Sequence, residues 1–334
     1  MSITAKELAR ILNLSEAAVS MALNGKSGVS TKTKNLVLRT AEEYGYDFSR
    51  INHNKKKYGT IYFIKYRKYG AVVTSTEFFE LLTRFMSQYC KELGYKLVIL
   101  EISDNDNISE LLSSTLRHDC IGIILLGTEM YKEDFFPFAC IDYPIVLLDS
   151  YFYSSKMDCI SMNNVEGAYQ ATKYLIQKRH AQPGYLHSSY NIYNFEERQL
   201  GFRKALHDCG MSTSKSIVHL LPPSMEGACA EMLNIIKKGE ELATCYFADN
   251  DLIAAGAMKA FKRMGYKIPD DIGIVGFDNV PLCTYLEPNL TSINVPIKYM
   301  CQMAVKRLIE SIEDTHYTPI KIEVNTNLIR RQSV

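Results

Sequence analysis

A helix-turn-helix pattern in the first 46 residues constrains this chain more than any other feature. Residues 3–12 are rich in Ala and Leu, residues 13–15 form a short turn, and residues 16–25 predict a second helix. Thr4, Ser15 and Ser30 precede predicted helices, where short hydroxyl side chains cap free backbone N–H groups. The residues expected in a small core are Leu8, Ala9, Leu12, Val19, Ala22, Leu23, Leu36, Val37, Thr40 and Ala41. This pattern predicts a head that reads the DNA major groove; an unrelated three-helix bundle is the alternative.

Length and composition place this head on a larger globular body. The chain has 334 residues, of which 47% are hydrophobic and 22% are charged. The longest apolar runs, 121–126 and 145–148, are strand-sized, and no secretory signal opens the chain. Nine cysteines are scattered without a C-x-x-C pair. We therefore expect a cytoplasmic protein with reduced thiols and no disulfide, metal, cofactor or membrane contact.

Positive charge is concentrated at the start of the chain. Residues 1–60 hold seven Lys and three Arg against four Glu and one Asp, a balance of +5. The remaining residues hold 28 basic and 32 acidic side chains, a balance of −4. A basic head on a mildly acidic body fits a polyanion that is bound at one end of the molecule.

The body alternates between apolar runs and amphipathic stretches. The expected strands are residues 60–64, 96–100, 121–126, 145–148, 184–186, 244–247 and 272–275. The expected helices are residues 78–93, 164–178, 196–209, 251–263 and 296–312. Such alternation predicts parallel sheets with helices on both faces, and about 275 residues suit two sheets.

Short motifs are spread over both parts of the chain. The head reads A-x-x-L-x-L-S-x-x-x-V-S-x-x-L-N-G from Ala9, then G-V-S-x-x-T and E-x-G-Y. The body contains E-R-x-x-G-F from Glu197, A-D-N-D from Ala248 and V-G-F-D-N from Val275. Over essentially its whole length the chain resembles the lactose/galactose repressor (LacI/GalR) family of bacterial regulators. The resemblance implies an α/β fold class: an all-α helix-turn-helix head, then a bilobed type I periplasmic-binding-protein-like body with two parallel sheets flanked by helices.

The resemblance also implies how the chain is divided. Residues 1–47 would form the DNA-binding head, residues 48–58 a hinge or linker, and residues 59–334 an effector-binding and dimerisation body. The N-lobe would hold about 59–160 plus 291–322. The C-lobe would hold about 162–289 plus 323–334.

Carried over from the family, a set of head residues would contact DNA. The short polar side chains near helix starts would meet phosphates: Thr4, Ser15, Ser20, Asn24, Ser30 and Thr33. The base-reading positions would be Glu16, Ala17 and Met21. Many relatives carry Arg or another long polar group in place of Met21. Because Met and Ala contact thymine methyl groups and Glu accepts from cytosine, we expect an operator read largely through apolar contacts.

The joint after Tyr46 departs from the family pattern. Relatives carry P-N-x-x-A-x-x-L, which folds on DNA and inserts its Leu into the minor groove. Here the segment reads D-F-S-R-I-N-H-N-K-K-K from Asp47, so Lys55 replaces the wedge. In one interpretation Lys55, Lys56 and Lys57 neutralise phosphates, and in the other they belong to a solvated linker. Measuring operator bend would distinguish a kinking joint from a joint that does not kink.

Three polar residues follow predicted strands of the body. Arg198, Asn250 and Asp278 lie where carboxyl ends of strands open onto a cleft. Their donors and acceptors suit the vicinal hydroxyls of a sugar, and the family uses these positions for its effector. Helix caps, a turn former and a surface ion pair are the alternatives. Further lining residues are expected to be Asp149, Met162 and Phe78, although Phe78 is equally suited to the core.

The nature of the ligand is less constrained. Residues 65–76 are basic and tyrosine-rich, which permits an anionic or phosphorylated sugar if this loop lines the cleft. A solvated loop is the other interpretation. The sequence carries no phosphate loop, no G-x-S-x-G and no H-E-x-x-H, so we do not expect an enzyme.

Together these features predict a sequence-specific transcriptional repressor whose operator affinity is controlled by a small ligand, most simply a sugar or sugar derivative. Two chains would pair as a homodimer so that two heads meet two half-sites. No heptad-bearing tail follows Arg331, which favours a dimer over a tetramer. Control by a protein partner or a corepressor is the alternative.

The base-reading hypothesis predicts that Met21→Arg changes the operator preference. Arg forms a bidentate contact with guanine that Met cannot form, so the variant should favour guanine at the contacted position. Operator footprinting and binding to a base-substituted operator series would measure this. An unchanged base preference would contradict the assignment of Met21.

Overall fold

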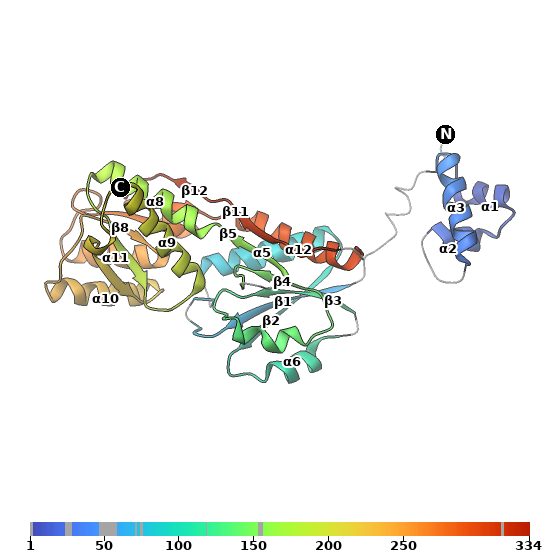
Figure 1. The fold of residues 1–334 in the computed structure, drawn as a ribbon, viewed down its shortest axis with the longest axis horizontal. Helices are drawn as coiled ribbons and strands as arrows, with labels where there is room; N and C mark the ends of the chain where they lie inside the picture. The colour runs from blue at the N-terminus through green and yellow to red at the C-terminus, as the bar shows by residue number, and fades with distance from the viewer. Residues whose placement is uncertain are drawn as a thin grey trace. The chain divides into compact units, whose positions relative to one another are not determined.

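The computed structural model describes residues 3–23, 29–46, 59–70, 72–73, 76–117, 119–152, 156–314 and 317–334. The chain divides into two compact units, Met1–Tyr58 and Gly59–Val334, here called the head and the body and described separately. Figure 1 labels their helices and strands. No helix within the described residues is long and apolar enough to cross a membrane.

The described residues of the head form three helices, each opened by the hydroxyl residue that the sequence indicates. The helices are α1 (Ala5–Leu12), α2 (Glu16–Leu23) and α3 (Thr31–Glu43). Thr4 forms a capping box with Glu7, because its hydroxyl accepts from the Glu7 N–H and the Glu7 carboxylate accepts from the Thr4 N–H. The Ser15 and Ser30 hydroxyls accept from the third N–H of α2 and α3, at 3.1 Å each.

The predicted core of the head is largely confirmed. Leu8, Val19 and Val37 are fully buried where the three helices meet. The prediction for Leu36 is wrong, because its side chain is 51% exposed. Leu36 precedes the buried Val37 by one residue. Because a helix turns about 100° per residue, the Leu36 side chain points away from the face that packs on α1 and α2.

The first sheet of the body is entirely parallel. Its order is β11-β5-β4-β3-β1-β2. The strands are β1 (Thr60–Arg67), β2 (Lys96–Ser103), β3 (Cys120–Leu126), β4 (Ile145–Leu148), β5 (Asp158–Met162) and β11 (Lys321–Val324). The accompanying helices are α5 (Glu77–Glu92), α6 (Ile108–Thr115), α7 (Phe136–Ala139) and α12 (Ile297–Glu313).

The second sheet has the same plan with one antiparallel edge strand. Its order is β12-β10-β9-β8-β6-β7, and only β12 runs antiparallel to its neighbour. The strands are β6 (Gly184–Ser188), β7 (Val218–Leu221), β8 (Cys245–Ala248), β9 (Gly273–Asp278), β10 (Thr291–Asn294) and β12 (Asn327–Ile329). The accompanying helices are α8 (Asn164–Arg179), α9 (Tyr193–Asp208), α10 (Met225–Lys237) and α11 (Asp251–Arg263). The predicted α/β fold class with two sheets is confirmed.

The chain passes between the two lobes three times, after β5, β10 and β11 (Figure 1). Two of the expected lobe boundaries differ from this topology. Residues 291–294 pair with β9 in the second sheet, and residues 321–324 pair with β5 in the first. The boundaries therefore lie after Asn294 and Val324, because strand pairing rather than hydrophobic pattern decides which sheet these short strands join.

A buried carboxylate anchors the loop after β1. Glu129 is only 2% exposed, and its two oxygens accept hydrogen bonds of 2.7–3.2 Å from the backbone N–H groups of Lys68, Tyr69, Gly70, Val72 and Val73. Val72 and Val73 are buried. The interpretation of residues 65–76 as a solvated loop is therefore wrong for Val72 and Val73, whereas Tyr69 and Gly70 are exposed.

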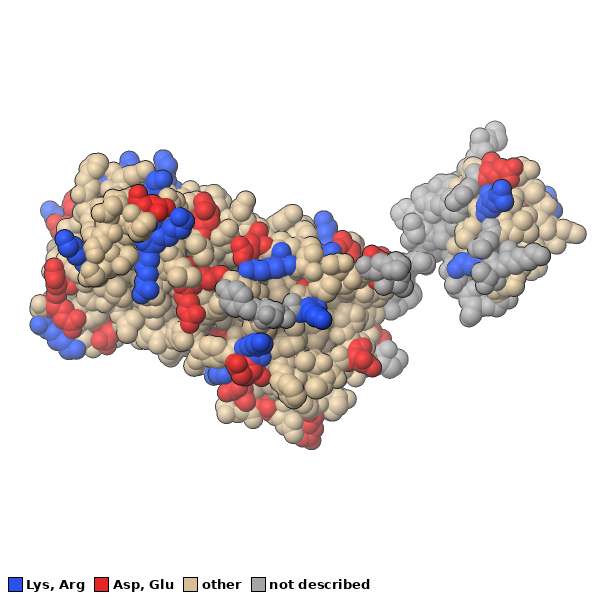
Figure 2. All heavy atoms as spheres, viewed as in Figure 1, with Lys and Arg blue, Asp and Glu red and all other residues tan. Residues whose placement is uncertain are grey.

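On the face of the body drawn in Figure 2, Lys and Arg side chains are interspersed with Asp and Glu among the described residues. A polyanion binds most strongly to a surface on which one sign of charge gathers. This face of the body therefore lacks the charge pattern of a DNA-binding surface.

We expect Glu129→Gln to destabilise the body by about 2–4 kcal/mol. Glutamine keeps the shape but presents an NH2 group to backbone donors, which leaves some of the five N–H groups unsatisfied. Urea denaturation followed by circular dichroism would measure the free energy of unfolding. The exposed Glu240→Gln is the matched control, and equal stability of the two variants would contradict the anchoring role.

Candidate functional site

The head exposes most of the residues predicted to contact DNA. Glu16, Ala17 and Ser20 are exposed on α2, and Met21 is half-buried beside them. Thr4, Ser15 and Ser30 are exposed caps, and the Thr33 hydroxyl lies 2.8 Å from that of Ser30. The remaining predicted positions, Asn24, Lys55, Lys56 and Lys57, lie outside the described residues.

The capped starts of the helices have two properties that favour contact with DNA phosphates. The hydroxyls of Thr4, Ser15 and Ser30 already accept backbone N–H groups of their own helices. The Ser15 hydroxyl still holds a proton that it can donate to a phosphate oxygen, whereas the Thr4 hydroxyl donates its proton to the Glu7 carboxylate at 2.7 Å. The partial positive charge of each helix start adds a favourable field for an anion.

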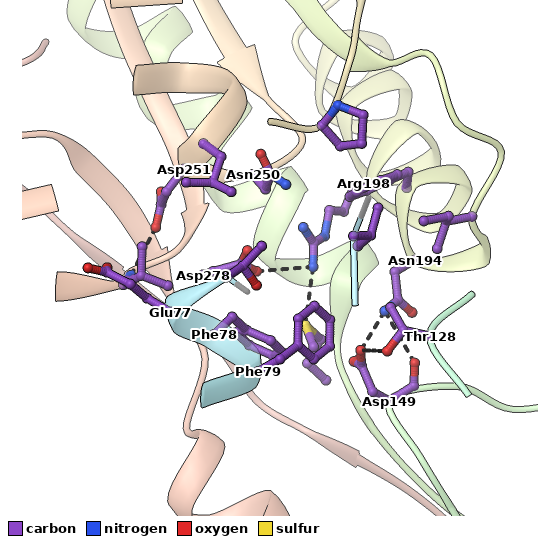
Figure 3. Close-up of a pocket in the computed structure, with 18 residues that line it drawn as sticks. Glu77, Phe78, Phe79, Thr128, Asp149, Asn194, Arg198, Asn250, Asp251 and Asp278 are labelled. Carbon is purple, nitrogen blue, oxygen red and sulfur yellow. Dashed lines mark hydrogen bonds and ion pairs between the residues drawn. The ribbon is translucent and has the colours of Figure 1, made fainter. Parts of the chain in front are cut away.

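A central pocket lies between the two lobes of the body, and all six predicted effector residues line it. Phe78 comes from the start of α5, Asp149 follows β4, and Met162 ends β5. From the second lobe come Arg198, Asn250 and Asp278. Figure 3 shows Arg198 reaching toward Asp278, with Phe78 and Phe79 beside it. Segments far apart in sequence thus converge, as the rule of strand carboxyl ends predicts.

Arg198 lies at the centre of this pocket with 3% of its surface exposed. Its Nε donates to Asn164 Oδ1 at 2.9 Å, and its Nη1 donates to the carbonyl oxygen of Asp249. Its Nη2 lies 3.3 Å from both Asp278 Oδ1 and Met162 Sδ. The interpretation of Arg198 as a surface ion pair is therefore wrong. The helix also begins earlier than expected, at Tyr193, which places Arg198 in its second turn.

Asp149 forms the acceptor group at the other end of the pocket (Figure 3). Thr128 donates to Asp149 Oδ2 at 2.6 Å, and the Asn194 amide donates to Asp149 Oδ1 at 3.1 Å. Burial raises the pKa of Asp149 from its ordinary value of 3.8 to about 6, although these hydrogen bonds and the charge of Arg198 favour the ionised form.

Two more carboxyl groups, those of Asp278 and Asp251, interact with the positive charge of Arg198. Burial and the neighbouring carboxyls Asp251 and Asp149 raise the pKa of Asp278, against the opposing effect of Arg198. Burial also raises the pKa of Asp251 to about 6, while hydrogen bonds from Ser292 and the Val280 N–H lower it. One guanidinium thus faces three buried carboxyls, so the pocket is rich in acceptors.

Two of these acceptors occupy uncommon backbone conformations. Asp149 has φ of 62° and Asp278 has φ of 106°, both in the region that favours glycine. Such conformations cost about 1–3 kcal/mol each and persist where the surrounding structure enforces them. Here they turn the carboxyls into the pocket from the ends of β4 and β9.

Asn250 both caps a helix and lines the central pocket. It is the N-cap of α11, and its Oδ1 accepts from the Ile253 N–H at 2.8 Å. The helix-cap interpretation is therefore correct for this oxygen. Because Asn250 also lines the pocket, its amide nitrogen supplies a donor to the site.

The lobes lie close together across the pocket. Glu77 of α5 accepts from the Leu282 N–H at 2.9 Å, and the Tyr151 hydroxyl donates to Glu197 Oε1 at 2.6 Å. The enclosed space is about 40 Å³, which holds a few waters but no sugar ring. A ligand of sugar size therefore requires the lobes to separate or the side chains to rearrange.

Sequence reasoning missed several residues that line this pocket. They are Glu77, Phe79, Thr128, Asn194 and Asp251. Thr128 follows β3, so the rule that selected Asp149 and Asp278 could have found it. Glu77 and Asn194 lie in the first turns of α5 and α9. The sequence patterns placed the starts of these helices one and three residues too late, so both residues fell outside the predicted helices.

The basic loop before α5 contributes no free charge to the pocket. Lys68 Nζ forms an ion pair with Asp134 at 2.8 Å and lies 4.7 Å from the Tyr131 ring centroid. Lys65 and Arg67 face Glu101 at 3.8 and 3.3 Å. These contacts remove the basis for expecting a phosphorylated ligand. Among the described residues, no group of three or more His, Cys, Asp and Glu could hold a metal ion.

Comparison with known proteins extends over the full chain. Residues 172–334 match the family model for a periplasmic binding protein-like domain. The HTH-type transcriptional repressor PurR of Pasteurella multocida (strain Pm70) is 28% identical over 341 residues, covering 99% of this chain and 98% of the relative. A transcriptional regulator CelR–cellobiose complex shares 21% identity at a TM-score of 0.72, covering 99% of this chain and 100% of that one. A Lac repressor dimer bound to operator and the anti-inducer ONPF shares 19% sequence identity at a TM-score of 0.71. The match covers 100% of this chain and 99% of that one.

The raised pKa of Asp149 predicts that the body loses stability as pH rises. The folded state binds the Asp149 proton more tightly than the unfolded chain does. This contribution is therefore complete below about pH 3.8 and is lost as pH rises through about 6. The change corresponds to about 3 kcal/mol for this group. Denaturation at pH 5 and pH 7 should show a smaller difference for Asp149→Asn than for the wild type, and an equal difference would contradict the assignment.

Proposed function

We propose that the chain is a member of the lactose/galactose repressor (LacI/GalR) family of bacterial transcriptional regulators and that it is an operator-binding repressor controlled by a small ligand in the central pocket. The observation that carries this proposal is the convergence of Arg198, Asn250 and Asp278 on one pocket between two lobes. Its relatives are repressors rather than enzymes.

The head supplies the DNA-binding half of the proposal. Glu16, Ala17 and Ser20 present an exposed surface on α2, the second helix of the motif. In this arrangement the second helix enters the major groove while capped helix starts meet the backbone. The Lac repressor structure bound to operator is of a protein with this fold. DNA contact by Asn24 and by Lys55, Lys56 and Lys57 remains part of the proposal.

The central pocket supports a sugar or sugar derivative as the effector. Carboxyl acceptors on both lobes and the donors of Arg198 and Asn250 match adjacent hydroxyl groups, which donate and accept. Phe78 and Phe79 offer apolar surface for the face of a ring. CelR, whose fold this chain shares, is seen in complex with cellobiose.

Ligand binding would act on the contacts that join the lobes. Asn194 on α9 donates to Asp149 of the first lobe, and Arg198 Nη2 lies 3.3 Å from Met162 Sδ of β5 in the first lobe. Ligand hydroxyls that take over these partners would change the free energy of one lobe arrangement relative to another. In a homodimer this change would alter whether two heads reach two half-sites, and by linkage operator DNA would alter ligand affinity equally.

The proposal predicts that Arg198→Lys keeps operator binding and loses the ligand response. Lysine retains the charge but lacks the planar fork that contacts Asn164, Asp278 and the Asp249 carbonyl together. A sugar panel titrated against operator affinity would identify the effector, with a change of about tenfold or more in the wild type. Arg203→Lys, on the exposed side of the same helix, is the matched control.

The direction of the response separates the alternatives. Release of the operator indicates an inducer, and tightening indicates a corepressor. If no sugar of the panel changes the operator affinity and operator binding is intact, control by a protein partner is favoured and a sugar effector is contradicted. An unchanged response in Arg198→Lys would remove Arg198 from the site.

A further inference from the structure

A second pocket lies at the seam between the lobes and shares no residue with the central pocket. It has a volume of about 270 Å³. Its walls come from the loop after β3, the loop after β4, and the first turn of α9. We call it the seam pocket. Its aromatic walls are Tyr131, Tyr151, Phe152 and Tyr193, with Met130 beside them.

The aromatic walls are held in place by hydrogen bonds across the seam. Tyr193 of the second lobe donates to the Tyr151 hydroxyl at 2.6 Å, and Tyr151 donates to Glu197 at the same distance. The two tyrosine rings meet edge to face with centroids 4.8 Å apart. The Tyr131 hydroxyl donates to the Asn191 carbonyl at 2.7 Å. The pocket is therefore preformed by contacts that join both lobes.

A buried hydroxyl on the pocket wall lacks a partner. Ser150 is 1% exposed, lines the seam pocket, and its Oγ forms no hydrogen bond with any part of the chain that the structure describes. A buried polar group left unsatisfied costs about 1–3 kcal/mol, and nearly all such groups have partners in native proteins. Because this oxygen has almost no exposed surface even with the seam pocket empty, a ligand there cannot reach it while the side chain keeps this position.

Two carboxylates and one cation belong to the described lining of the seam pocket. Glu133 and Glu196 are exposed on its rim, and within the described ranges neither forms an ion pair. Lys132 is the one cation on the wall. Burial, the hydrogen bond with Tyr69 and the charge of Glu196 raise the pKa of Tyr131, which shows that the acidic field reaches the aromatic wall.

The aromatic faces of this cluster already attract cations. Lys68 Nζ lies 4.7 Å from the Tyr131 centroid, and Lys321 Nζ lies 2.9 Å from that of Tyr151. Tyrosine faces bind ammonium groups through the ring quadrupole. A ligand that combines a ring with an ammonium group would match both the apolar walls and the acidic rim.

We propose that the seam pocket is a second ligand site that binds a small aromatic amine. One ring fits the volume, which lies just below the range of about 300–1,000 Å³ for typical small-molecule sites. The ring packs among the tyrosines, and the ammonium group faces Glu133 and Glu196. The proposed ligand is distinct from operator DNA and from the effector in the central pocket.

A hydrogen-bonded chain joins the seam pocket to the central pocket. Glu197 accepts from Tyr151 through Oε1 and from Asn164 through Oε2, at 2.6 and 3.0 Å. Asn164 Oδ1 in turn accepts from Arg198 Nε at 2.9 Å. An amine bound at the seam contacts both lobes and therefore stabilises the arrangement in which Arg198 is held. Amine binding should accordingly raise the Tm of the body.

The test uses three matched probes on the full-length chain: tyramine, 4-ethylphenol and 4-hydroxyphenylacetate. They share a phenol ring and differ in carrying a positive, neutral or negative group. Isothermal titration calorimetry at low salt should give affinity in the order tyramine, then 4-ethylphenol, then 4-hydroxyphenylacetate. Absence of saturable tyramine binding, or equal affinity for the three probes, would overturn the proposal.

Variants then locate the bound probe. The double variant Glu133→Gln/Glu196→Gln should weaken tyramine binding about tenfold, through the loss of one or two charge-assisted contacts. Glu226→Gln, an exposed carboxylate in the first turn of α10, should leave it unchanged. Loss of binding in Asp278→Asn with no effect of the rim variant would place tyramine in the central pocket and refute the seam site.

Discussion

The buried guanidinium of Arg198 is the contact on which the arrangement of the body depends. It is 3% exposed, and its carbon lies 3.7 Å from the centroid of the Phe277 ring. A charge buried to this extent is tolerated only where hydrogen-bond partners surround it, and Arg198 finds them on β5, α8, the end of β8 and β9. The same side chain thereby links the crossing strand to the second sheet and presents its remaining donors to the central pocket.

The carboxyls around Arg198 show how stability and binding oppose each other at this site. Asp149 and Asp278 adopt positive φ, and burial raises the pKa of both. Each feature costs folding free energy, yet together they leave acceptors aimed into the small space of the central pocket. A ligand with several hydrogen-bond donors would stabilise these buried carboxylates. Its binding would therefore lower the free energy of the bound state relative to the empty state.

Local chemistry explains which elements sequence patterns could predict. Hydroxyl caps located α1, α2 and α3, and continuous apolar runs located the central strands of both sheets, such as β3 and β4. The strands β5, β7, β10, β11 and β12 escaped because each mixes polar and apolar residues over only three to five positions. Leu36 was misplaced because a step of one residue turns a side chain by about 100° around a helix, enough to move it off the buried face.

The sequence by itself determined the class of protein: the motif of the head, the alternation of strands and helices in the body, and six residues that line the central pocket. These depend on residues close together along the chain and on the rule that parallel strands end at one edge of a sheet. Only the tertiary structure decided that Glu129 anchors the loop after β1, that Lys68 faces Asp134, and that Ser150 lies unpartnered at the seam between the lobes. Burial, pairing and pKa arise from groups far apart in sequence, so no local pattern encodes them.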